Sequence, residues 1–491
     1  MSIRLLSRDV AFYGTLDFLQ RSLSVVLVPI YTRVLTRSDY GNLDLILTVW
    51  SVVTVLVDLQ FIAGFTRLYL ERRQAGDGPR FVGTAILVRT VISGTVAAAV
   101  LILGFAGFLE LRFIPSFLNN SVAWTIVMLG IPVALAYEVL LAQAQMLRWK
   151  KWFFAGAFGN TLLSTVLCVI FTVALHWGVA GVAAGQMIGT FSAMTILFTG
   201  LRGEISFQFQ TNLLKQIAHY SLPIVPGRWL SHFSAYIGRF FVFAGFGAAE
   251  NAILAIAAKL AAVVGLFCLA FRTAWQPLAM AYIGDKNSET FYVRSLRVFL
   301  AGGLFSVAAL ILLTRPILAI LAPDSYAVAE YYVPFFLVAS IIGELDTNLQ
   351  LGNQIAKKTY WISVAAALAF GINVTVLLTL TIRLGIYAAA IGLLLGFGAK
   401  ATLTYITGRR NYRIAYDKSS LLVFAGGCAA IVTLAVARSR GLLSDVPFYI
   451  SIAVLGLALP FVILGAAERQ VIYAVLAERI PRRLNGRAHN Y

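Results

Sequence analysis

Charged side chains are scarce in this sequence of 491 residues: Asp, Glu, Lys and Arg make up 12% of it, whereas hydrophobic residues make up 60%. Soluble domains carry about 25% charged residues, so the composition excludes a soluble globular protein. With 13 prolines and no glycine period, the chain is neither disordered nor collagen-like. The class that remains is a polytopic membrane protein.

Cysteine and histidine are also rare, with three and four residues. Each cysteine lies inside an apolar run, which is typical of a small packed residue and not of a disulfide or metal ligand. The chain has no G-x-x-x-x-G-K-[ST], H-E-x-x-H or G-x-S-x-G motif, so ATP hydrolysis, zinc hydrolysis and serine catalysis lack their residues. We therefore expect no enzyme, no metal and no cofactor.

Fourteen apolar runs are long enough to cross a bilayer, which takes about 20 helical residues. Their ranges are 10–32, 41–68, 81–108, 120–146, 153–174, 178–200, 217–245, 250–281, 296–314, 329–354, 360–381, 384–407, 419–437 and 446–467. With a cytoplasmic N-terminus, the inside segments hold 24 Lys and Arg residues and the outside loops hold seven. This asymmetry accounts for the net charge of +18 without a nucleic-acid partner, and it predicts that both termini are cytoplasmic.

An internal repeat relates residues 143–189 to residues 350–396 at an offset of 207. Both copies hold a glutamine, then a Lys-Lys pair, then a run of small residues (GVAGVAAGQMIG and GIYAAAIGLLLG). Six spans separate the copies, so they share one orientation, as in transporters built from two parallel bundles.

The predicted fold is an all-α polytopic membrane protein with about 14 transmembrane helices. Its parts are six-helix bundles in 1–200 and 201–416 around a central cavity, two additional helices in 417–467 and a basic cytoplasmic tail in 468–491, part of which could lie on the membrane as an interfacial helix.

Charges inside the predicted spans are costly, at about 2.5–3.5 kcal/mol each in the middle of the membrane. They should line a wet cavity or pair with one another. The basic ones are Arg21, Arg67, Arg89, Arg228, Arg239, Lys259, Arg272 and Lys400, and the acidic ones are Asp17, Asp44, Asp58, Glu138, Glu344 and Asp346. All six acids are candidates for ion or proton coupling, or for charge pairing; Asp17 and Arg21 can pair on their own helix.

The depth of the basic residues suggests different roles. Arg67, Arg89, Arg228 and Arg272 lie near the predicted cytoplasmic ends, where snorkelling to the headgroups is the simpler interpretation. The deeper Arg21, Arg239 and Lys259 are predicted to face the cavity and to bind an anion, because arginine pairs well with phosphate oxygens. Arg228 and Arg272 complete the set of candidate substrate-binding residues.

Span 217–245 carries Pro223 and Pro226 close to Arg228. A proline inside a membrane helix permits a bend, so this span could be a gating element. Alternatively, the two prolines simply begin the helix, where they do no harm.

Several motifs resemble those of Wzx-type O-antigen flippases, in the polysaccharide-exporter branch of the MOP superfamily. The stretch VPIYTRVLTRSDYG (28–41) is similar to the family's L-P-[LI]-Y-T-R-x-L-[ST]-x-x-[ED]-Y-G, and YSLPIVP (220–226) to its Y-x-L-P-[LI]-[VI]-P. Residues 248–264 resemble the family's E-x-G-[IV]-Y-x-x-A-x-K stretch, and residues 273–280 resemble the aromatic-x-P ending of the same helix. One departure concerns the acidic residue of the family's D-R element, which is Gly238 here, next to a retained Arg239.

The resemblance implies a flippase that moves undecaprenyl-diphosphate-linked oligosaccharide repeat units from the cytoplasmic to the periplasmic leaflet by alternating access, driven by an ion gradient. It implies a location in the bacterial inner membrane, and a polysaccharide polymerase and chain-length proteins as partners. The polymer served could be O antigen, as part of lipopolysaccharide, or an exopolysaccharide. Two alternatives stay open: a lipid II flippase of the MurJ type and a drug or metabolite antiporter of the MATE type.

Overall fold

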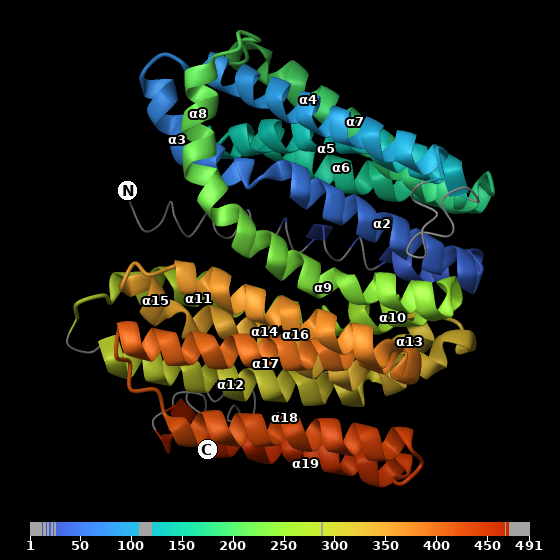
Figure 1. Cartoon of the computed structure of the whole chain (residues 1–491), viewed down its shortest axis with the longest axis vertical. Helices are drawn as coiled ribbons and strands as arrows, with labels where there is room; N and C mark the ends of the chain where they lie inside the picture. Colours follow the sequence, from blue (N-terminus) through green and yellow to red (C-terminus); the bar gives the residue numbers. More distant parts are fainter. Residues whose placement is uncertain are drawn as a thin grey trace, which may run out of the picture. The chain divides into compact units, whose positions relative to one another are not determined.

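The computed structural model describes residues 12, 16, 19, 20, 23, 26–107, 120–285, 288–466 and 468–470. In this part of the chain every regular element is a helix (Figure 1). The helix bounds are α2 Arg37–Asp58, α3 Phe61–Gln74, α4 Gly78–Phe105, α5 Ser121–Met146, α6 Lys150–Val169, η3 Ile170–Ala174, α7 Gly178–Leu201, η4 Arg202–Glu204, α8 Thr211–Ser221, η5 Leu222–Ile224, α9 Val225–Phe246, α10 Ala248–Ala261, α11 Val264–Ala281, α12 Ser288–Leu312, α13 Thr314–Leu321, η6 Asp324–Tyr331, α14 Val333–Leu349, α15 Leu351–Ile355, α16 Tyr360–Leu384, α17 Ile386–Asn411, α18 Lys418–Ser439 and α19 Asp445–Ile463.

The prediction of an all-helical membrane fold is confirmed. Among the described residues, eleven helices are long and apolar enough to cross a membrane, or twelve if η6 and Val333–Ile355, bent by 52°, form one span. Eleven of the 23 residues of the predicted span 10–32 lie outside the described residues, as does most of the predicted tail 468–491. The predicted span 217–245 corresponds to α8 and α9, which are not among the eleven. The count of fourteen therefore stays a prediction.

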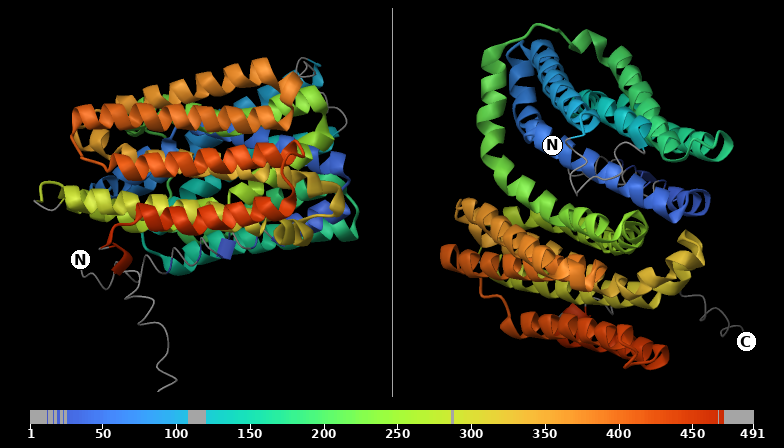
Figure 2. Two further views of the ribbon diagram at one scale, coloured as in Figure 1. Left: turned by 90° about the horizontal axis from the view of Figure 1, so that it is seen from below. Right: turned by 45° about the vertical axis from the view of Figure 1, so that its right-hand side comes forward.

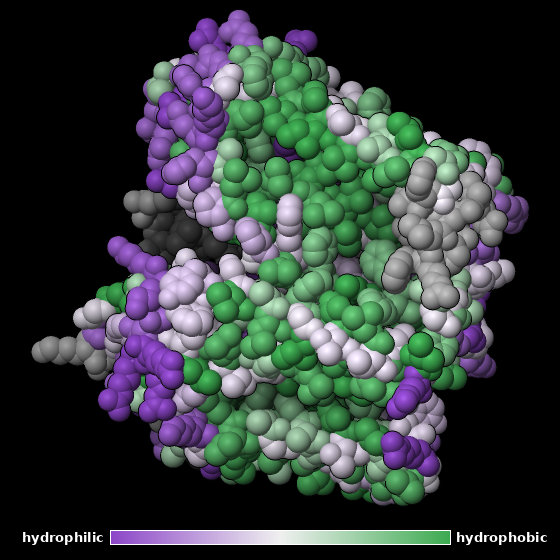
Figure 3. Space-filling view, viewed as in Figure 1, coloured by the Kyte–Doolittle hydropathy of each residue, from purple (hydrophilic) through white to green (hydrophobic). Residues whose placement is uncertain are grey.

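The chain forms two compact units, described separately here. Unit 1 consists of residues 1–256, 316–329 and 366–393, and unit 2 of residues 257–315, 330–365 and 394–491. On the face drawn in Figure 3, hydrophilic residues gather at the ends of the helices and apolar residues cover their middles, which is the pattern expected of helices that cross a bilayer. The predicted bundles 1–200 and 201–416 stay a prediction.

In unit 1, α7 packs on α6 and α5, and α5 packs on α4. The predicted span 41–68 is interrupted: α2 ends at Asp58, and Leu59 and Gln60 both adopt left-handed conformations, with φ of 48° and 55°. Such a conformation costs a non-glycine residue roughly 1–2 kcal/mol, so the surrounding contacts must hold this break in place. The chain also bends near Pro223 and Pro226, where η5 joins α8 to α9 (Figure 1).

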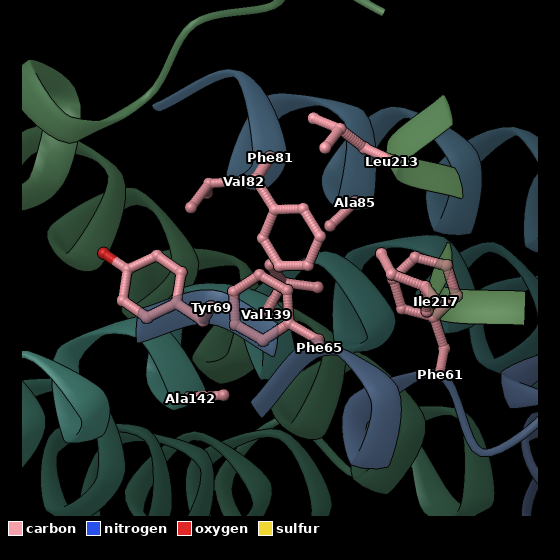
Figure 4. Packing of buried hydrophobic residues seen from close by; sticks show 10 residues of the cluster. All are labelled: Phe61, Phe65, Tyr69, Phe81, Val82, Ala85, Val139, Ala142, Leu213 and Ile217. Carbon is pink, nitrogen blue, oxygen red and sulfur yellow. The ribbon is translucent and has the colours of Figure 1, made fainter. Parts of the chain in front are cut away.

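The packing of aromatic side chains next to Leu59 and Gln60 stabilises the break between α2 and α3. Phe65 of α3 stacks on Phe81 of α4, with ring centroids 5.3 Å apart, and on Tyr69 at 5.4 Å. Figure 4 shows these rings in one cluster with side chains from α5 and α8, including Val139 and Ile217. Fully burying side chains of this size stabilises the fold by about 1.5–3 kcal/mol each, which offsets the strain of the two left-handed residues.

The repeat detected in the sequence has a local structural counterpart within unit 1. Gly178 begins α7 and Gly385 precedes α17, and both have a φ of +55°. Farther along these helices, a Cβ on Gly185 would lie 2.5 Å from the Cys168 nitrogen, and a Cβ on Gly392 would lie 2.3 Å from Asn373 Oδ1. At corresponding positions, then, glycine lets each helix approach the preceding one closely.

In unit 2, α18 and α19 form an antiparallel pair that packs on α12 (Figure 2). At one end, Arg438 of α18 donates hydrogen bonds to Glu330 and, at 2.8 Å, to Asp445 of α19. The Arg438 side chain is 4% exposed, and Glu330 also accepts from Arg315 at 2.9 Å. Arg438 and Glu330 are buried, whereas Arg315 and Asp445 are nearly half exposed. Two positive charges meet two negative ones, so the network fixes the helix pair without leaving a buried charge uncompensated.

At its other end, the helix pair is fixed by Asp417, the N-cap of α18. Its carboxylate accepts hydrogen bonds from Ser419 and Ser420 and from Nη2 of Arg297 on α12, at 2.6 Å. The hydrogen bond from the Ser419 side chain, followed by those from Ser420 and Arg297, holds the pKa of Asp417 well below its usual range.

Asp417→Asn should lower the stability of the purified protein by about 1 kcal/mol or more at neutral pH, because a cap and a charged hydrogen bond are weakened. A depressed pKa stabilises the fold above the unfolded-state pKa of about 3.9, and this contribution is lost as the pH falls through the lower folded-state pKa. The difference in Tm between wild type and variant should therefore shrink below about pH 4. A difference that is constant from pH 7 to pH 3 would contradict the ionic role of Asp417.

Candidate functional site

Asp44, Ser51 and Asp58 recur every seven residues and give α2 a polar stripe, of which Asp44 and Ser51 face α9 within unit 1. Asp44 Oδ2 accepts a hydrogen bond from Arg239 Nε at 2.9 Å, and the two side chains are 10% and 13% exposed. Asn251 of α10 donates to the Gly41 carbonyl at 3.0 Å and to Asp44 Oδ2 at 3.4 Å. The guanidinium of Arg239 also lies over the Tyr236 ring, 5.0 Å from its centre. This deep ion pair joins a residue of the first half of the sequence to one of the second.

Two further polar contacts continue along the same helices. Ser51 Oγ lies 3.0 Å from His232 Nε2, and Trp229 Nε1 donates to the Val55 carbonyl at 3.0 Å. Residue numbers rise along α2 as they fall along α9, as expected for antiparallel helices in one register. We call these three contacts, with the Asp44–Arg239 pair at one end, the α2–α9 seam.

The seam explains why Gly238 departs from the acidic residue of the family motif. A Cβ at Gly238 would lie 2.9 Å from the Ala389 Cβ, so a larger side chain would require Ala389 to shift. Asp44, which is distant in sequence, supplies the acidic partner of Arg239 instead. Gly41 of α2, about one turn before Asp44, allows an even closer approach, because a Cβ there would lie 1.7 Å from the Ala248 carbonyl oxygen.

A second charged cluster lies at the break after α2. One nitrogen of Arg89 on α4, Nη2, donates to Asp58 Oδ1 at 2.6 Å and to Glu138 Oε2 on α5 at 2.7 Å. The Arg89 side chain is 2% exposed, so the interpretation that it snorkels to the headgroups is wrong. Its place toward the predicted cytoplasmic end of the span 81–108 suggested snorkelling, but Asp58 and Glu138 hold it inward over the Phe61 ring.

In unit 2, the polar residues of α14 also find partners. Lys400 Nζ of α17 lies 3.0 Å from Asp346 Oδ2, and these side chains are 15% and 6% exposed. Arg272 of α11 lies 3.9 Å from Glu344, in a looser and more exposed pair. All five acidic candidates in the described part of the chain thus pair with a basic residue, as the sequence analysis allowed.

Of the other predicted residues, Arg228 on α9 and Lys259 on α10 are exposed. Arg21 and Asp17 lie outside the described residues. Whether the candidate residues contact a substrate stays a prediction. Within the described residues, no group of three or more His, Cys, Asp or Glu side chains is placed to hold a metal ion.

Two cavities complete the description of the site. One, of about 540 Å³, lies in unit 2 between α14, α17 and α18; its wall is mostly apolar, and Tyr405, Arg409 and Lys418 lie toward one end. The other, of about 260 Å³, lies in unit 1 between α2, α5, α6 and α7 and includes Trp50 in its lining. Sequence analysis indicated neither cavity, because each is formed by helices whose packing a single sequence does not reveal.

Comparison with known proteins gives a family and a fold. The family model described as "Polysaccharide biosynthesis protein" matches residues 6–282. No curated protein matches the sequence. Among solved structures, "Lipid II flippase MurJ, inward closed conformation" is similar at a TM-score of 0.70 with 13% identity, covering 95% of this chain and 100% of that one.

Two MOP superfamily transporters are similar over a smaller share of the chain. One is an inward-facing multidrug resistance MATE family transporter, with a TM-score of 0.60 and 16% identity over 80% of this chain and 94% of that one. The other is a transporter from Pyrococcus furiosus whose title reports a binding pocket of reverse polarity, with a TM-score of 0.55 and 16% identity over 82% and 94%. At these identities the likeness establishes the fold alone.

Proposed function

The chain belongs to the polysaccharide biosynthesis protein family, and on this premise we propose that it is a flippase for undecaprenyl-diphosphate-linked oligosaccharide repeat units. It carries them from the cytoplasmic to the periplasmic leaflet of the bacterial inner membrane, with both of its own termini in the cytoplasm. A polysaccharide polymerase and chain-length proteins act on the product.

The cavity in unit 2 is the main observation in favour of a lipid-linked substrate. Its apolar wall, formed in part by Ile342, Leu345 and Leu421, suits a prenyl chain. Arg409 near the end of α17 and Lys418 at the start of α18 are exposed at one end of the same cavity. Two cations next to an apolar groove match a diphosphate attached to a hydrocarbon chain, because cationic side chains bind phosphate oxygens by charge-assisted hydrogen bonds.

The α2–α9 seam supports alternating access. It joins helices of the two sequence halves by one ion pair and two other polar contacts. Contacts of this kind can be exchanged for contacts with water, whereas an apolar interface of the same length would expose hydrocarbon on opening. In this proposal the seam closes one side of the translocation path and parts when that side opens. An ion gradient drives the cycle through the paired acids Asp44, Asp58, Glu138, Glu344 and Asp346.

The likeness to the MurJ structure, which covers 95% of this chain, favours lipid II as the alternative substrate. A MATE-type antiporter fits less well: a cationic drug needs an unpaired acid, and each acidic candidate in the described residues already has a basic partner.

A deletion strain separates these functions. Its polyprenyl-diphosphate lipids are extracted and their sugars identified by mass spectrometry, while surface polysaccharide is measured in parallel and the wild-type gene serves as the restoring control. Accumulation of a lipid-linked repeat unit with loss of surface polymer is the expected result. Accumulation of lipid II would support the alternative substrate. No change in either pool would overturn the proposal.

A further inference from the structure

The cavity in unit 1 combines an apolar lining with neutral polar side chains. Among the described residues, its lining includes six neutral polar side chains and no charged one. The polar side chains are Asn160, Thr161, Ser164, Thr165, Gln186 and Thr190. All come from α6 and α7, at helical spacing, so the two helices together form one hydrophilic wall.

Hydrogen bonds within this wall orient its amide. Asn160 Oδ1 accepts from Ser164 Oγ at 3.1 Å and from Thr190 Oγ1 at 3.3 Å. With both hydroxyls donating to this oxygen, their own lone pairs can accept hydrogen bonds, and the amide nitrogen of Asn160 can donate. The wall therefore offers donors and acceptors side by side.

The rest of the lining is apolar. It includes Trp50 and Leu47 of α2, Ile126 and Val127 of α5, and Met187 of α7. An indole supplies a flat hydrophobic surface. The ligand that fits this lining has one hydrophilic edge and one apolar face.

We propose that this cavity is a subsite for one neutral sugar ring of the lipid-linked oligosaccharide, an inference that rests on the proposed function. Each hydroxyl of a pyranose is both donor and acceptor, which matches the wall, and the C–H face of the ring matches Trp50. A volume of about 260 Å³ equals about nine water molecules at roughly 30 Å³ each, which accommodates one ring and not a chain of them.

The lining also excludes other ligands. A uronic acid or an amino sugar would bring a charge into a cavity where the described lining residues supply no counter-charge, which is costly. A prenyl chain would leave the hydrophilic wall unpaired. The subsite thus selects for neutral sugars within a substrate whose charge lies on the diphosphate.

The position of Trp50 connects this subsite to translocation. Trp50 directly precedes Ser51, which contacts His232 in the α2–α9 seam. One turn of α2 therefore contributes both to the cavity and to the α2–α9 seam. When α2 moves away from α9, the indole of Trp50 moves with it. The sugar would be held while the seam is closed and released as the seam parts.

The test uses purified full-length protein in detergent and two probes, undecaprenyl diphosphate and the lipid-linked repeat unit isolated from the deletion strain. Wild type should bind the sugar-bearing lipid more tightly than the bare lipid. Thr190→Val keeps the shape of the side chain and removes the hydroxyl, so we expect affinity for the sugar-bearing lipid to fall about threefold to tenfold. Affinity for undecaprenyl diphosphate should stay unchanged.

Thr195→Val is the matched control. Thr195 lies on the same helix and is exposed, and its hydroxyl donates to the Phe191 carbonyl of its own helix. The substitution should therefore leave the affinities for both lipids unchanged. Ser164→Ala is the second pocket variant if Thr190→Val does not fold, as judged by Tm and size-exclusion chromatography.

Equal losses for both lipids, or none for the sugar-bearing lipid in folded pocket variants, would overturn the subsite. If wild type binds both lipids equally while the deletion strain accumulates the repeat unit, the subsite fails and the proposed function stands. If no repeat unit accumulates, the proposed function itself fails.

Discussion

Arg239→Met should abolish most surface polysaccharide when it is the only copy in the cell, and it should also destabilise the purified protein by about 3–5 kcal/mol. The variant leaves Asp44, which is 10% exposed, without its cation. Asn251 remains at 3.4 Å from this carboxylate, but a neutral amide does not balance a buried charge. Surface polymer and Tm are the two readouts.

The double variant Asp44→Leu/Arg239→Met separates stability from function. Replacing both partners of a buried ion pair by apolar residues is often neutral or stabilising, so the double variant should recover most of the Tm that Arg239→Met loses. If the pair is part of a seam that must open to water, polysaccharide export should stay low. Full export by the double variant would mean that the pair is only structural, and the seam would then have no part in the cycle.

Arg89→Met should also destabilise the purified protein by about 3–5 kcal/mol, because Arg89 joins three helices through one buried guanidinium. Without it, the carboxylates of Asp58 and Glu138 face each other. Asp58 also ends α2, where the negative end of the helix dipole disfavours a carboxylate. Tm and the yield of monodisperse protein measure the loss.

The exposure of the two acids predicts which second change rescues Arg89→Met. Asp58 is 15% exposed and Glu138 is 45% exposed, so the Glu138 side chain has room to turn away from Asp58, whereas Asp58 is enclosed. Asp58→Asn should therefore restore more stability than Glu138→Gln. The control is Arg67→Met, which removes an exposed arginine paired with Glu71 on its own helix and should leave Tm unchanged. Equal rescue by both second changes would contradict the burial argument.

The positions of most helices and the polar stripe of α2 could be predicted from the sequence, because apolar runs and a seven-residue spacing are local patterns. The partners of the stripe could not. Asp44 and Arg239 are 195 residues apart, and nothing local indicates that they meet. The same holds for Arg89: its place toward the end of the predicted span 81–108 suggested a role at the membrane surface, whereas its burial depends on acids from two other helices.

The break after α2 shows a second limit. Helix ends are usually predicted from glycine, proline or a capping residue, and Leu59-Gln60 contains none of these. The break exists because tertiary packing, the Phe65 cluster on one side and the Arg89 charges on the other, outweighs local preference. The sequence of this segment fits an uninterrupted helix, so a single span over 41–68 was the natural prediction.

The register of the α2–α9 seam restricts how these two helices can separate. Its contacts pair Asp44 with Arg239, Ser51 with His232 and Val55 with Trp229. A piston-like slide of α2 by one helical turn, about 5.4 Å, would break all three together and place polar groups against the wrong neighbours. A tilt lets the contacts peel apart from one end, so that only one is broken at a time. The two helices should therefore separate progressively from one end. In the intermediate states, the contacts that remain keep the helices in the same register when they close again.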